Sequence, residues 1–89
     1  MSKQELNRIV SEGLMRSYRF LIVEIHTEGS LSPEIIINSR ECVADKLAHY
    51  NSVYDDHLEQ IESKSQGRRV RITDAWMTNQ LRDLAVFFD

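Results

Sequence analysis

The chain has 89 residues, of which 42% are hydrophobic and 28% are charged, and its formal net charge is -3 at pH 7. This length allows one hydrophobic core and leaves no room for a second, so we expect a single domain over residues 1–89. The composition excludes a disordered or fibrous chain, and the mild negative charge excludes a protein whose whole surface attracts nucleic acid.

The first predicted element is a helix over residues 3–16. Ser2 and Glu5 have the spacing of a capping box, in which two side chains satisfy backbone N–H groups at a helix start. Apolar residues then recur three and four positions apart, which places them along one side of a helix. These residues are Leu6, Ile9, Val10, Gly13 and Leu14.

Two strands are predicted next, over residues 18–26 and 34–38, joined by a loop that contains Gly29 and Pro33. Both faces of the first strand are apolar: Phe20 and Ile22 point to one side, and Leu21, Val23 and Ile25 point to the other. Only one face can contact the main helix layer. We therefore expect the face with Phe20 and Ile22 to form, beside Met77, part of an interface with a partner.

The longest predicted element is a helix from Asn38 or Ser39 to about Ser63. Its apolar residues have a heptad-like spacing, and its length of about 35 Å exceeds that of so small a core. Either this helix bends near Asn51, or its far end packs on a partner chain. The second alternative predicts self-association that buries Tyr54, Leu58 or Ile61.

The last predicted elements are a strand over residues 70–76 and a short helix capped by Thr78. In the strand, Val70, Ile72 and Trp76 alternate with Arg69, Arg71 and Thr73. The order α-β-β-α-β-α predicts an α+β fold, with about three mainly antiparallel strands packed with helices.

Part of this pattern resembles a known group of proteins. The stretches are Phe20-Leu21-Ile22-Val23-Glu24-Ile25 with Pro33-Glu34-Ile35-Ile36-Ile37-Asn38, followed by Arg71-Ile72-Thr73-Asp74. Together they resemble small uncharacterised proteins encoded by phages and prophages of Gram-positive bacteria. The resemblance implies a phage or prophage context, and it implies no activity and no functional residue.

Candidate catalytic and metal-ligating groups are few. Asp45, His49 and Asp56 share a broad helix face that could bind zinc or iron, but a solvated polar face is the simpler interpretation. Cys42 lies at a helix start, where a thiol can become nucleophilic, and His26 is its only reasonable base. A small buried residue is the simpler interpretation of Cys42. We predict no catalytic residue, no metal, no cofactor and no enzymatic activity.

One concentrated basic run stands out, formed by Lys64, Arg68, Arg69 and Arg71. Such a run could hold a phosphate, a nucleotide or an acidic partner by forked hydrogen bonds. Acidic residues just upstream are placed to neutralise it instead. They are Asp55, Asp56, Glu59 and Glu62.

Two function hypotheses result. The first is a non-enzymatic protein-interaction module that forms a homodimer or larger homo-oligomer, such as a phage accessory protein or an inhibitor of a host or defence protein. The second is a binder of small anions, nucleotides or nucleic acid that uses the basic run. The lone cysteine and the absence of a long apolar run predict a cytoplasmic protein, in the host cytoplasm if phage-encoded, with no membrane partner.

Overall fold

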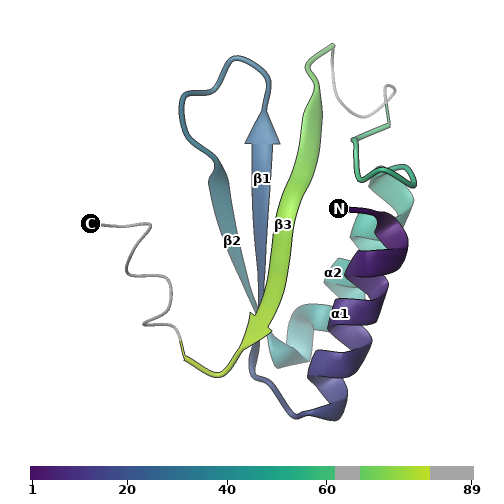
Figure 1. Ribbon diagram of the computed structural model, residues 1–89, viewed down its shortest axis with the longest axis vertical. Coiled ribbons are helices and arrows are strands. Elements are labelled where there is room, and N and C mark those ends of the chain that lie inside the picture. Colours follow the sequence, from purple (N-terminus) through teal and green to yellow (C-terminus); the bar gives the residue numbers. More distant parts are fainter. Residues whose placement is uncertain (62–66, 81–89) are drawn as a thin grey trace.

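A computed structural model describes residues 1–61 and 67–80 of the chain (Figure 1). Its elements are α1 (Lys3–Met15), β1 (Phe20–Thr27), β2 (Glu34–Ser39), α2 (Arg40–Val53) and β3 (Val70–Thr78). The strands form an antiparallel sheet in the order β2-β1-β3. The predicted α+β fold is confirmed, and the predicted helix after Thr78 lies outside the described residues.

Both ends of α1 are closed by local hydrogen bonds. At the start, the Ser2 Oγ accepts a hydrogen bond from the Glu5 backbone N–H at 3.1 Å. At the end, Ser17 has a φ of 61°, and the N–H groups of Ser17 and Tyr18 donate to the carbonyls of Leu14 and Gly13. This is the Schellman arrangement, which satisfies the last carbonyls of a helix and turns the chain toward β1.

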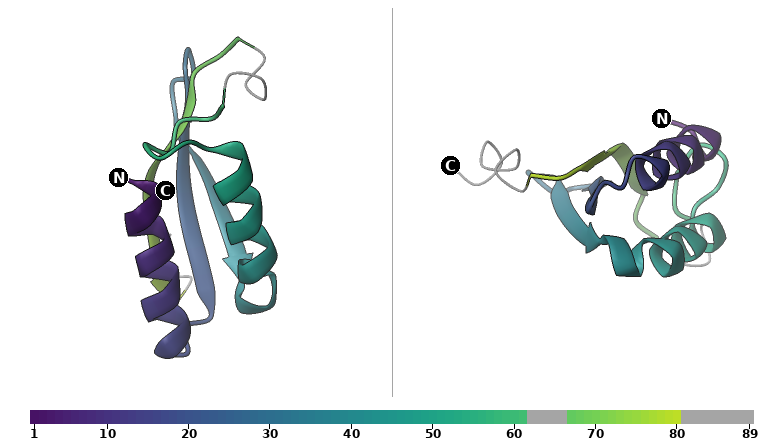
Figure 2. Two further views of the ribbon diagram at one scale, coloured as in Figure 1. Left: turned by 90° about the vertical axis from the view of Figure 1, so that its right-hand side faces the viewer. Right: turned by 90° about the horizontal axis from the view of Figure 1, so that it is seen from below.

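The two helices lie on the same face of the sheet, as Figure 2 shows. They meet it through a core to which α1, α2 and the strands all contribute. The buried core residues are Leu6, Val10, Leu21, Val23, Ile25, Val43, Tyr50, Tyr54, Leu58, Ile72 and Ala75. Leu21, Val23 and Ile25 therefore form the inner side of β1, as their alternation predicted.

The predicted long helix is shorter than expected. It ends at Val53, and Tyr54 already has an extended backbone with a φ of -109°. The chain then folds back on itself, since Ile61 N donates to the Val53 carbonyl. Tyr54 and Leu58 enter the monomer core from this turn, with 4% and 0% of their surfaces exposed. Because both side chains lie in the monomer core, the prediction that a long helix buries Tyr54 and Leu58 against a partner chain is wrong, whereas Ile61 is 41% exposed.

A second correction concerns β3. Its register with β1 shifts between Glu24 and Ile25, which lie opposite Asp74 and Ile72, so Thr73 is an extra residue. This bulge puts Ile72 on the helix side and Trp76 on the opposite side, although both were predicted to share one face. Met77 packs against the core, so it does not lie beside Phe20 and Ile22 as predicted.

Candidate functional site

We call the sheet surface that points away from α1 and α2 the outer face. The strand registers arrange its residues in rows across the sheet. From one end of the sheet to the other, the rows are Ser39, Phe20 and Thr78, then Ile37, Ile22 and Trp76, then Ile35, Glu24 and Asp74, and lastly His26 and Arg71. Neither described helix covers this surface.

One end of the outer face is apolar. Ile22 lies between Ile37 and Trp76 in the register, and it is fully buried without belonging to the core between sheet and helices. Ile37, on the edge strand, is 42% exposed, whereas Phe20 and Trp76 are half-buried. The pair Phe20 and Ile22, predicted to lie apart from the main helix layer, does so.

Charged residues occupy the other end of the outer face. Glu24 and Asp74 lie directly opposite each other, and the Thr73 Oγ1 donates a hydrogen bond to the Glu24 Oε1 at 2.6 Å. Carboxylates placed in opposite positions of neighbouring strands repel each other. Beyond them, His26 lies opposite Arg71. The outer face thus passes from apolar to acidic to basic along the strands.

A half-open pocket of about 280 Å³ adjoins the basic end. It lies where β1 ends and β3 begins, and its lining residues are His26, Glu28, Gly29, Glu59, Arg69 and Arg71. Two carboxylates and two guanidinium groups therefore share this pocket. As a site it is almost neutral rather than strongly basic.

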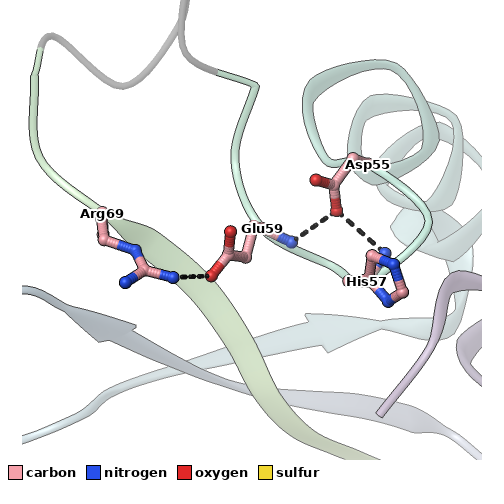
Figure 3. A network of polar contacts seen from close by, with 4 residues as sticks. All are labelled: Asp55, His57, Glu59 and Arg69. Atoms are coloured by element: carbon pink, nitrogen blue, oxygen red, sulfur yellow. Dashed lines mark hydrogen bonds and ion pairs between the residues drawn. The ribbon is translucent and has the colours of Figure 1, made fainter.

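The basic run is partly neutralised by the turn that follows α2, as Figure 3 shows. The Arg69 Nη2 donates to the Glu59 Oε1 at 2.6 Å, and this contact raises the pKa of Arg69. The turn itself is held by Asp55, whose Oδ1 accepts from the N–H groups of His57 and Glu59 at 2.9 and 3.0 Å. Of the upstream acids, Glu59 therefore does what the sequence indicated.

The remaining basic residues are separated. Arg71 faces the first pocket, while Arg68 lines a second hollow beside Ser30. Lys64 lies outside the described residues. The four predicted cations therefore do not form one anion site among the described residues. Arg69 is paired with Glu59, and Arg71 and Arg68 line different hollows.

The other candidate residues do not meet. Cys42 is exposed rather than buried, because the inward position of this turn of α2 is taken by Val43. It lies next to Ser39, at the Phe20 end of β1, whereas His26 is six residues away along that strand, roughly 20 Å. In the described part of the chain, no three metal-ligating side chains gather, so Asp45, His49 and Asp56 do not form a metal site.

The opposed carboxylates of Glu24 and Asp74 were not predicted from the sequence. Alternation along β1 already placed Glu24 on the same side as Phe20 and Ile22, so half of that signal was available. Asp74 could not be assigned to this face, because its side depends on the bulge at Thr73.

The described helices include none that is long and apolar enough to cross a membrane.

No family model, curated protein or solved structure matches this chain, so the candidate site is supported by geometry alone.

Proposed function

We propose that this chain is a non-enzymatic protein-interaction module that binds a protein partner through the outer face of its sheet. The observation that carries the proposal is Ile37, which is 42% exposed at the edge of an outer face that neither α1 nor α2 covers, in one row with the buried Ile22 and the half-buried Trp76. Apolar residues gathered on one surface, with charged residues at the rim, are typical of interfaces.

The charges beside the apolar row indicate the chemistry of the partner. Glu24 and Asp74 lie directly opposite each other, so a cationic group placed between them would be attracted to both carboxylates. The partner is then a protein surface with apolar side chains next to an arginine or lysine. Charge complementarity of this kind speeds association and fixes the orientation of the two proteins.

The biological setting is part of the same proposal. The resemblance of the strand segments to phage and prophage proteins supports a phage accessory protein, or an inhibitor of a host or defence protein, acting in the host cytoplasm. A small rigid domain with one apolar face is suited to either role, since both require binding without chemistry.

The test uses two variants matched in chemistry. Ile37→Lys places a charge in the apolar row, and Leu31→Lys places the same charge in the loop between β1 and β2. Ile37 is 42% and Leu31 is 103% exposed, so we expect both variants to fold. Circular dichroism and thermal unfolding check this.

Affinity capture from the source cells is then quantified by mass spectrometry for wild type and both variants. A specific partner should be captured by wild type and by Leu31→Lys, and be reduced at least tenfold with Ile37→Lys, about 1.4 kcal/mol of binding free energy. If Ile37→Lys captures the same proteins as wild type in the same amounts, the outer face is not the interface.

A second candidate function is anion binding, favoured by the opposition of Arg71 and His26 in the half-open pocket. The probe is inorganic phosphate or a nucleoside phosphate, titrated and followed by native mass spectrometry and calorimetry. Binding should weaken with salt and disappear with Arg71→Gln, whereas Arg68→Gln should have little effect. Absence of binding at millimolar concentration would exclude this function.

A further inference from the structure

The two edge strands of the sheet, β3 and β2, differ in how far their free backbone N–H and C=O groups are covered. On the free side of β3, Ile72 N donates to the Leu58 carbonyl and Gln60 N donates to the Val70 carbonyl, so the turn after α2 occupies the first part of that edge. The bulge at Thr73 interrupts the edge further along. Occupied and bulged edges do not accept another strand readily.

Among the described residues, none protects the edge formed by β2 in either of these ways. In the described part of the chain β2 pairs only with β1, in a regular register without a bulge. Its only charged residue is Glu34, at its first position, and its centre is Ile35, Ile36 and Ile37. β-Branched side chains favour strand pairing, and an uncharged open edge is a template for another strand.

We propose that β2 pairs antiparallel with β2 of a second copy of this chain, about a two-fold axis at Ile36. The two three-stranded sheets then form one continuous sheet. In this register Ile35 lies beside the partner's Ile37, and Glu34 lies beside the partner's Asn38. No like charges meet, and every isoleucine faces an isoleucine.

Self-complementarity is the reason for choosing a second copy as the occupant. An isologous strand pair requires that each residue suit its symmetry mate, and many strands fail because like charges would meet. The sequence from Glu34 to Asn38 passes this condition at every position. A chain of this size also buries little surface alone, so it gains from dimerisation. This inference is independent of the proposed function, because it uses the backbone edge of β2.

The proposed register makes a charge-swap test possible. Ile35→Lys combined with Ile37→Lys would place lysines beside each other across the two-fold axis. Ile35→Lys combined with Ile37→Glu would place a lysine beside a glutamate. Within the monomer, the lysine at position 35 lies opposite Glu24 in both variants, and Ile37 is 42% exposed on the edge strand, so both variants should fold.

Sedimentation velocity of the full chain, from low to high micromolar concentration, measures the outcome. We expect a dimer for wild type, a monomer for the double-lysine variant, and a salt-sensitive dimer for the lysine and glutamate variant. A wild-type monomer at high micromolar concentration, or identical behaviour of the two variants, would overturn the proposal.

The same variants separate this inference from the proposed function. Both place charges on the outer face, so both should lose the captured partner. Only the double-lysine variant should lose the dimer.

Discussion

Gly13 lets α1 approach β3 more closely than any side chain would allow. A Cβ at this position would lie 2.8 Å from the Met77 Cβ and would also collide with the Met77 Sδ. The sulfur can move, but the Met77 Cβ is fixed by the strand backbone. We expect Gly13→Ala to lower the free energy of unfolding by about 1–3 kcal/mol, despite the higher helix propensity of alanine.

Urea denaturation measures this effect, with Ser11→Ala as the control. Ser11 is exposed on the same helix, so its substitution should be neutral or slightly stabilising. Equal stability of the Gly13→Ala variant and wild type would contradict the close packing of α1 on β3.

The second prediction at the residue scale concerns pH. Burial raises the pKa of Tyr50 and of Tyr54, and Glu34 adds to both shifts. The folded chain therefore holds these phenolic protons more tightly than the unfolded chain. Their contribution to stability is fully present below pH about 10, the unfolded value, and is lost as pH rises through the folded pKa.

Tyr50→Phe tests this contribution. The buried Tyr50 Oη makes no hydrogen bond of ordinary geometry in the described part of the chain, although the Asn38 side chain is near enough to lower the Tyr50 pKa against the larger effect of burial, so removing the hydroxyl should cost little at neutral pH. The loss of stability above pH 10 should become smaller in this variant, as measured by urea denaturation across the alkaline range. Tyr18→Phe is the control. An unchanged alkaline loss in Tyr50→Phe would show that other groups cause it.

At the scale of elements, the start of α1 and the central residues of β1 and β2 were predictable, because each is determined by residues close by in the sequence. Ser2 caps the helix, and alternation along β1 separates Leu21 and Val23 from Phe20 and Ile22. The end of α2 was not predictable from the apolar spacing, since Tyr54 and Leu58 continue the helical pattern although they follow a turn. Leu58 has a φ of 60°, which nothing in a leucine side chain indicates.

The candidate site was predictable to the same extent. Phe20 and Ile22 could be assigned to a separate face by alternation alone. Trp76 and Met77 were assigned to the wrong sides because a single extra residue, Thr73, reverses the faces of β3. The neutralisation of Arg69 was anticipated from charge order, and the structure identifies Glu59 as its partner.

Asp55 is the residue that organises the turn after α2, and this gives a prediction for the element. Asp55→Ala removes two hydrogen bonds to a carboxylate, from His57 N and Glu59 N, and should destabilise the chain by about 1–3 kcal/mol. Asp56→Ala is the matched control, because Asp56 is the next residue, is also exposed, and does not make the two hydrogen bonds of Asp55. Thermal unfolding compares the two. If both variants melt at the same temperature, the Asp55 bonds do not hold the turn.

At the scale of the whole molecule, the strand order β2-β1-β3 gives the backbone amides of the sheet three environments. Strand β1 is paired on both sides, and Leu21, Ile22 and Val23 are fully buried. Strand β3 is partly covered on its free edge by the turn after α2. Strand β2 directs alternate amides toward its open edge.

Hydrogen exchange followed by NMR can therefore separate the two proposed associations. In dilute protein, the amides of β1 should exchange most slowly, and alternate amides of β2 should exchange fast because no acceptor among residues 1–61 and 67–80 lies beyond the edge. Pairing with a second copy should protect those alternate β2 amides as the protein concentration rises. A partner that binds the outer face through side chains should leave them exchanging, because side chains on that face point perpendicular to the strand hydrogen bonds. Concentration-independent exchange throughout β2 would exclude the edge dimer while leaving binding at the outer face intact.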